Sequence, residues 1–207
     1  MSTTSSDQPA KMDAWLYIDE ITHRTLNEYA IMLSMLRQAS RSTTDAAGSH
    51  ALGAVAKRLE ASAAAFCTLR PSREQGPCYL DDDLERLCAS LTESVLADRS
   101  IGLTLISERV RLSAQRCWQI CLIVSELVMN AAKHAFTATC PGEIVVKVCI
   151  VGGSIQCAVA DNGLAGPDAK SGRGSGIIDA LAAELRGTIA RNLSARGSTI
   201  VLRAPIA

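Results

Sequence analysis

The sequence has no excess charge of either sign. Its 21 lysines and arginines balance 21 aspartates and glutamates, so the formal net charge at pH 7 is +0. Such a chain has no global field that would hold it to DNA, RNA or an anionic membrane surface. We therefore expect no nucleic-acid partner, and any phosphate that the protein handles must be bound at a local site.

Long hydrophobic runs are also missing. The longest apolar stretches, residues 120–124 and 144–151, are far shorter than the roughly 20 residues that a membrane-spanning helix needs. Hydrophobic residues still make up 48% of the chain, which is enough apolar mass to close a core. The composition predicts a folded, soluble protein without a membrane span.

The eight cysteines include no Cys-x-x-Cys pair, and residues 1–11 lack a signal-peptide pattern. We interpret the cysteines as reduced and mostly structural, in a cytoplasmic protein. Cys117 and Cys121 are one helical turn apart, but no His or second Cys pair lies nearby in the sequence to complete a tetrahedral metal site. Core packing is therefore the preferred interpretation for both.

Two helical seams follow a leader, residues 1–14, that we expect to be disordered. Apolar and small residues then recur in alternating steps of four and three, which is typical of helices that pack lengthwise. The seam positions are Ile18, Thr22, Thr25, Tyr29, Met32 and Leu36, then Leu52, Val55, Leu59, Ser62 and Phe66. With a loop at 42–49 and a stop at Pro71, they predict a helical hairpin over residues 15–71. One hairpin cannot bury both faces of its seam, so we expect a homodimeric four-helix bundle.

Beyond a linker at 72–77, residues 78–207 mix strand and helix patterns. We expect helices near 84–95, 112–135 and 174–185, and strands near 102–106, 143–151, 154–160, 188–193 and 198–203. The Gly152-Gly153 pair is a strong hairpin signal. The predicted fold class is α+β: a helical hairpin followed by an α/β sandwich with a mixed sheet.

Three segments carry polar side chains in patterns that suit chemistry, and the first surrounds His23. Glu20 and Asn27 lie three residues before it and four after it, so the three share one helix face. A carboxylate that holds one ring nitrogen leaves the other as a nucleophilic lone pair. Glu20 and His23 are therefore candidate catalytic residues, against the alternative of an ordinary surface histidine.

The second segment lies in the predicted helix at 112–135. Glu126, Asn130 and Lys133 are spaced i, i+4 and i+7 and form one stripe. Carboxylate and amide oxygens suit Mg²⁺, and an ammonium suits phosphate, so the stripe is a candidate site for a metal and a polyphosphate, with Asn130 as the metal ligand. The competing interpretation is a solvated amphipathic face.

The third segment is rich in glycine. Asp161-Asn-Gly163 comes directly after a strand, and Gly172-Arg-Gly174 opens the helix at 174–185. Glycines ahead of a helix N-terminus let backbone N–H groups approach phosphate oxygens. Asp161 is placed to accept from the exocyclic amine of a base, although Asp-Asn-Gly is also an ordinary turn sequence.

Together the segments resemble the histidine-kinase superfamily, in particular its branch with a His-Arg-x-x-Asn phosphoacceptor box. His23-Arg24-Thr-Leu-Asn27 is similar to that box, residues 126–136 to the N box, Asp161–Gly163 and Gly172–Gly174 to the two glycine boxes, and residues 197–205 to the closing strand. The resemblance implies a dimerisation and phosphoacceptor hairpin at 15–71 and an ATP-binding catalytic domain at 78–207.

It also implies roles and partners. His23 would be phosphorylated from ATP, Glu126 would orient water or the phosphate chain, Asn130 would hold Mg²⁺ and Asp161 would read adenine. Gly163, Gly172 and Gly174 would frame the nucleotide lid. The phosphoryl group would pass to an aspartate of a response-regulator receiver domain in a two-component system, and the signal would come from a separate sensor or input protein.

Some positions depart from the family pattern. Ala165 replaces a glycine and the lid at 164–171 is short, and both features favour a histidine phosphotransferase with a degenerate nucleotide site. In the phosphoacceptor box, Leu26 stands where lysine is common. The polar residues kept in the second and third segments favour an active kinase; they are Glu126, Asn130, Lys133 and Asp161. A third alternative, an anti-sigma-type ATPase-fold binding module, assigns no role to the hairpin. Val159 and Ser125 depart from the neighbouring HWE-type branch, and the sequence leaves open whether phosphorylation occurs within a chain or across the dimer.

Overall fold

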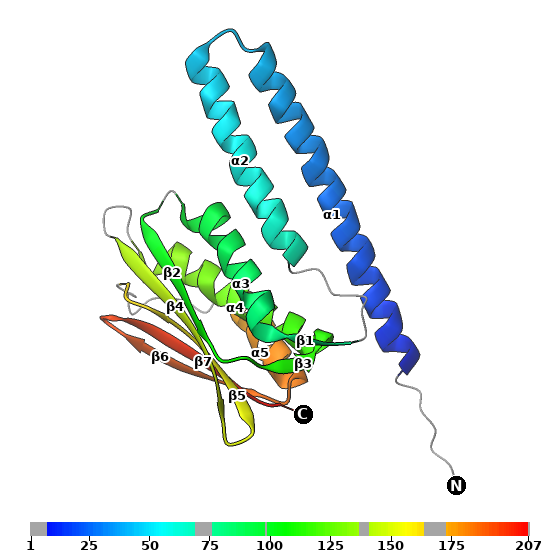
Figure 1. The fold of residues 1–207 in the computed structure, drawn as a ribbon, viewed down its shortest axis with the longest axis vertical. Coiled ribbons are helices and arrows are strands. Elements are labelled where there is room, and N and C mark those ends of the chain that lie inside the picture. The colour runs from blue at the N-terminus through cyan, green and yellow to red at the C-terminus, as the bar shows by residue number, and fades with distance from the viewer. Residues whose placement is uncertain (1–7, 69–75, 98, 137–140, 164–172, 207) are drawn as a thin grey trace. The chain divides into compact units, whose positions relative to one another are not determined.

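A computed structural model describes residues 8–68, 76–97, 99–136, 141–163 and 173–206 (Figure 1). The chain forms two compact units, Met1–Arg73 and Glu74–Ala207. The first is helical and the second combines helices with a sheet, which confirms the predicted fold class. Within the described ranges no helix is long and apolar enough to cross a bilayer.

The first unit is an antiparallel pair of helices, α1 (Gln8–Ser42) and α2 (Ala46–Thr68). Helix α1 begins at Gln8, inside the segment that the composition predicts as a disordered leader. The connection is shorter than the predicted loop because Asp45 caps α2. Its carboxylate accepts hydrogen bonds from the backbone N–H of Gly48 at 2.8 Å and of Ala47 at 3.3 Å, so the helix begins at once.

The seam of the hairpin combines small, polar and half-buried leucine side chains. Thr22 and Ala56 are buried, and an ion pair between Arg37 and Glu60 joins the two helices. Two predicted seam residues, Met32 and Val55, are instead 43% and 53% exposed. The side chains of Ile18 and Phe66 lie outside the described part of the structure. The large apolar side chains left exposed on the hairpin, here called the apolar face, are Ile21, Ile31, Met32, Met35 and Val55.

The second unit is a two-layer sandwich around a mixed five-stranded sheet. Its main elements are α3 (Leu80–Leu91), β2 (Ile101–Ser107), α4 (Ala114–His134), β4 (Gly142–Val151), β5 (Ser154–Asp161), α5 (Arg173–Glu184), β6 (Thr188–Ser194) and β7 (Gly197–Pro205). The strand order is β2-β4-β5-β7-β6, with β2 parallel to β4 and all other neighbours antiparallel. Helices α3, α4 and α5 cover one face of this sheet (Figure 1).

The alternation of apolar residues along the strands explains the core. Ile144, Val146 and Val148 of β4 point to the helical layer and are buried, whereas the residues between them are more exposed. Helix α4 supplies the opposite half of this core along one side, through Ile120, Ile123, Val124, Leu127 and Val128.

Two local features were not predicted. Strand β1 (Pro77–Tyr79) pairs with β3 (Arg111–Ser113) in a small second sheet, and a π-helical turn, η1 (Thr92–Leu96), extends α3. Because β3 occupies the residues just before α4, that helix begins at Ala114 rather than at Leu112. Ser113 caps it by accepting a hydrogen bond from the backbone N–H of Arg116 at 3.4 Å.

Candidate functional site

The imidazole of His23 is exposed on α1. The side-chain amide nitrogen of Asn27 lies 3.3 Å from its Nδ1, within hydrogen-bonding distance. Glu20, which the spacing predicted to contact the histidine, instead forms an ion pair with Arg24, with Oε1 2.7 Å from Nε. The i, i+4 spacing from Glu20 to Arg24 favours this pair, so Asn27 rather than Glu20 contacts the ring.

The predicted stripe of α4 lies along the outer side of the helix. Glu126 and Asn130 are half-buried and Lys133, in the last turn, is exposed, while Leu127 and Val128 on the opposite side are buried in the core. Because Glu126 and Asn130 are only half-buried, both side chains remain accessible to a ligand from solvent. Carboxylate and amide oxygens are the ligands that Mg²⁺ takes in proteins, so this donor set fits the ion.

Asp161 ends β5 with its carboxylate held by three donors. Oδ1 accepts from the backbone N–H of Gly163 at 3.0 Å and of Ser198 at 3.4 Å, and the Ser198 hydroxyl donates to Oδ2. Sequence reasoning missed Ser198, because its link to Asp161 depends on the register of β5 with β7. The contact between Asp161 and Ser198 becomes apparent only once the pairing of β5 with β7 is known.

The turn after Asp161 is pressed against the end of α4. A Cβ at Gly163 would overlap the carbonyl oxygen of Ala135, the C-cap residue of that helix. Gly197 has φ of +127°, and a Cβ there would overlap the carbonyl oxygen of Asp161. The turn after β5 and the end of α4 are therefore in direct contact, and each adjoins residues of the predicted nucleotide site.

The same turn is also tied to β4. The side-chain oxygen of Asn162 accepts from the backbone N–H of Glu143 at 2.8 Å, and the Asn162 N–H donates to the Glu143 carbonyl at 3.2 Å. The Asp161 carboxylate therefore sits on a turn whose backbone is fixed by β4, β7 and the end of α4. Such a preorganised acceptor suits recognition of an N–H donor on a ligand.

The second glycine box is described only in part. Gly174 lies in the first turn of α5, whereas Gly172 and the predicted lid at 164–171, including Ala165, lie outside the described residues. Helix α5 is joined to α4 by a hydrogen bond of 2.6 Å from the Gln119 side chain to Glu184.

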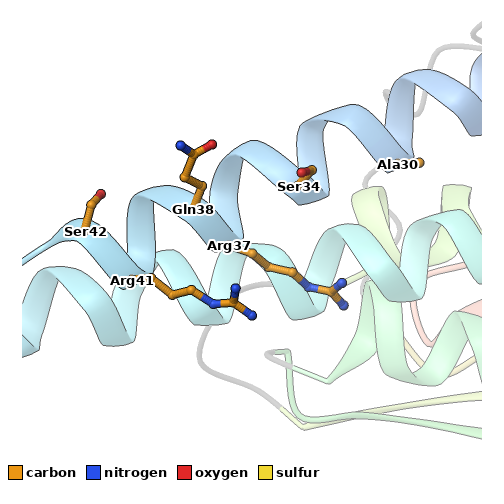
Figure 2. A pocket seen from close by; sticks show the side chains of 6 residues that line it. All are labelled: Ala30, Ser34, Arg37, Gln38, Arg41 and Ser42. Atoms are coloured by element: carbon orange, nitrogen blue, oxygen red, sulfur yellow. The ribbon is translucent and has the colours of Figure 1, made fainter.

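A separate hollow lies along the second half of α1 (Figure 2). Arg37 in its wall is the partner of Glu60 across the hairpin. The side chains that line it all follow His23 in the sequence, and none of the predicted nucleotide residues is among them. They are Ala30, Ser34, Arg37, Gln38, Arg41 and Ser42.

Comparison with known proteins matches both parts of the chain. The family model described as "Histidine kinase-like ATPase domain" matches residues 89–204, and the model described as "Histidine kinase" matches residues 20–95. The sensor histidine kinase PdtaS of Mycobacterium tuberculosis is 28% identical over 197 residues, which is 91% of this chain and 39% of the relative. The chain thus spans about two fifths of the length of the curated relatives it matches.

Solved structures share the fold at low sequence identity. The histidine kinase domain of the Erythrobacter litoralis EL346 blue-light activated histidine kinase aligns with a TM-score of 0.59 and 16% identity, over 86% of this chain and 96% of that domain. A bacterial phosphotransferase aligns with a TM-score of 0.60 and 12% identity, over 97% of this chain and 98% of that protein. The match to the ATPase-domain model alone covers more than half of the sequence, and the chain belongs to the family of histidine kinase-like ATPase domains.

Proposed function

We propose that the protein is the core of an ATP-dependent protein histidine kinase, which phosphorylates itself on His23 and passes the phosphoryl group to an aspartate of a response-regulator receiver domain. The observation that carries the proposal is the exposed imidazole of His23 with Asn27 at its Nδ1, in a chain that also has the ATPase-type fold. The match of the histidine kinase family model to residues 20–95, which include His23, supports it.

The contact with Asn27 bears on the nucleophilicity of the ring. A side-chain amide presents either its nitrogen or its oxygen to a partner. In the orientation in which the oxygen accepts Nδ1–H, Nε2 keeps a free lone pair. Nε2 then forms a bond to the γ-phosphorus of ATP as the bond to the β,γ-bridging oxygen breaks and ADP leaves, so the work of the protein is to position the reactants in line.

The second unit supplies the nucleotide contacts in this proposal. Asn130 would hold Mg²⁺ through its side-chain oxygen, Glu126 would orient water or the phosphate chain, and Lys133 would face the phosphate chain. A Mg²⁺ ion held there would supply charge neutralisation at the phosphoryl oxygens. Asp161, whose carboxylate is oriented by Gly163 and Ser198, uses its remaining acceptor capacity for the exocyclic amine of adenine.

The protein acts as a cytoplasmic homodimer in this proposal. The apolar face of the hairpin supports the dimer, since exposed large aliphatic side chains on one helix pair gain from burial against a second copy. A separate sensor or input protein delivers the signal.

The decisive experiment is incubation of the purified chain with γ-labelled ATP and Mg²⁺. Acid-labile label is expected on the wild-type protein and is lost in both His23→Ala and Asn130→Ala. His50→Ala is the matched control, because His50 is another exposed histidine of the same hairpin, and it is expected to keep the label.

Two results would contradict the kinase proposal. Label that persists in His23→Ala would place the acceptor elsewhere. Absence of label and of ATP binding by calorimetry, together with transfer from a phosphorylated receiver onto His23, would identify a histidine phosphotransferase instead.

A further inference from the structure

Two thiols and a carboxylate meet in the second unit, and none of them belongs to the proposed kinase site. Cys78 lies on β1, Asp83 in the first turn of α3 and Cys117 in the first turn of α4. The two sulfurs and a carboxylate oxygen all lie within 4.8 Å of one another. Cys117 is interpreted from the sequence as a core-packing residue, and its neighbour Cys121 is not a member of this cluster.

The fold fixes the backbone of all three residues. The pairing of β1 with β3 sets Cys78 opposite Leu112, and β3 leads directly into α4 and Cys117. Helix α3 follows β1 without a loop, and Leu80 at this junction is fully buried. The cluster therefore occupies the point where two strand-to-helix junctions are packed together, and its geometry does not depend on a flexible loop.

The cluster is accessible on one side. Cys117 is buried, whereas Cys78 and Asp83 are half-buried, so an ion has a path from solvent. Arg86 pairs with one oxygen of Asp83 at the outer edge. Burial, together with the nearby carboxylate of Asp83, raises the pKa of both thiols, which leaves them neutral in the absence of a cation.

We propose that Cys78, Asp83 and Cys117 form a binding site for one zinc-class divalent ion, with water as the fourth ligand. Two sulfurs and one carboxylate oxygen match zinc, whereas Mg²⁺ prefers oxygen ligands alone. In a tetrahedral site with Zn–S bonds of about 2.3 Å, two sulfurs are about 3.8 Å apart, so the two sulfurs need to approach each other by about 1 Å at most.

Binding of the ion is coupled to the release of protons. Each thiol loses its proton to solvent as its sulfur joins the metal, so two protons are released for each ion. The bound ion links β1 to the first turns of α3 and α4. Because α4 also carries Glu126 and Asn130, the metal would brace the helix that holds the predicted nucleotide ligands, but the site itself does not depend on the proposed kinase activity.

The test is a titration of the full chain, reduced and freed of metal, with Co²⁺ alone, followed by displacement with Zn²⁺. One equivalent of Co²⁺ is expected to give sulfur-to-cobalt charge-transfer absorption with tetrahedral d–d bands. Cys78→Ser is expected to abolish the charge-transfer band of the site, and Asp83→Asn to weaken Co²⁺ binding by at least about tenfold. Cys149→Ser, another half-buried strand cysteine of this unit, is the matched control and is expected to bind like the wild type.

Several outcomes would overturn the assignment: no thiolate band in the wild type, an unchanged band in Cys78→Ser, or equal loss of the band in Cys149→Ser. Circular dichroism checks that each variant is folded. If Cys78→Ser does not fold, Asp83→Asn decides the matter, because unchanged Co²⁺ affinity in that variant contradicts a three-ligand site. Zn²⁺ is also expected to raise the melting temperature of the wild type but not of Asp83→Asn to the same extent.

Discussion

At the scale of single residues, the turn after β5 depends on two glycines that have no room for a side chain. Gly163 touches Ala135, the C-cap residue of α4, and Gly197 touches the backbone of Asp161. The sequence showed Gly163 as part of a glycine box, but the reason for it, contact with Ala135, exists only in the fold. The local sequence predicts the turn at Asp161–Gly163, whereas the close approach of Gly163 to the backbone of Ala135 depends on the tertiary fold.

The first prediction concerns Gly163→Ala. The added methyl group meets the carbonyl of Ala135, so the turn must move, and we expect a loss of about 1–3 kcal/mol in unfolding free energy together with weaker ATP binding. Chemical denaturation and calorimetry measure the two effects. Gly76→Ala is the control, because nothing lies within 4 Å of a Cβ there. Equal stability and ATP affinity in the two variants would refute the contact.

A second prediction follows from buried thiols. Burial raises the pKa of Cys88 to about 11 and of Cys157 to about 12, from an ordinary value of 9.0. Between pH 9 and these values the unfolded chain loses the protons and the folded chain keeps them. Stability therefore falls as pH rises, by about 1.4 kcal/mol per pH unit for each thiol.

Urea denaturation at pH 8 and pH 10 measures this slope. Cys157→Ala is expected to make the slope shallower by the contribution of one thiol. Val159→Ala removes a similarly buried side chain of the same strand that does not titrate, so it should lower stability without changing the slope. Identical slopes in both variants would contradict the assignment.

At the scale of elements, the start of α2 rests on a single side chain. Asp45 accepts from two backbone N–H groups, of Ala47 and Gly48, which otherwise have no partner within the helix. We predict that Asp45→Ala costs about 1 kcal/mol of stability, measured by thermal unfolding followed by circular dichroism. Thr44→Ala, an exposed neighbour in the same loop, should leave the melting temperature nearly unchanged. A similar loss in both variants would show that the cap contributes little.

The sequence predicted the long elements well, because their periodic patterns are local. The hairpin helices, α4, α5 and the five sheet strands all lie near their expected positions. The β1–β3 pair escaped prediction, since each strand is three residues long and gains stability only from a partner distant in sequence. The cysteine cluster was missed for the same reason, because Cys78 meets Cys117 through that pairing.

For the whole molecule, the exposed apolar face of the hairpin predicts the oligomeric state. Met35 is 65% exposed, and a glutamate there would place a carboxylate in an apolar interface, which costs several kcal/mol. We expect wild-type protein to elute as a dimer and Met35→Glu as a monomer, measured by light scattering after size exclusion. Ile106→Glu, at an exposed apolar position of β2, is the control and should remain dimeric.

Deletion of residues 15–70 tests the same interface without a point charge. The remaining second unit is expected to be monomeric, because the apolar face is removed entirely. A dimer that survives both this deletion and Met35→Glu would place the interface in the second unit.

The mixed sheet also has a consequence for the order in which this unit folds. Strands β4 and β5 are joined by a two-residue turn, and β6 and β7 by a similarly short one, so these pairs close small loops. The parallel pairing of β2 with β4 must wait until α4 has crossed between them. We therefore expect the two hairpins to nucleate the sheet and the β2 edge to join last, which makes that edge the first part exposed to proteolysis when the unit opens.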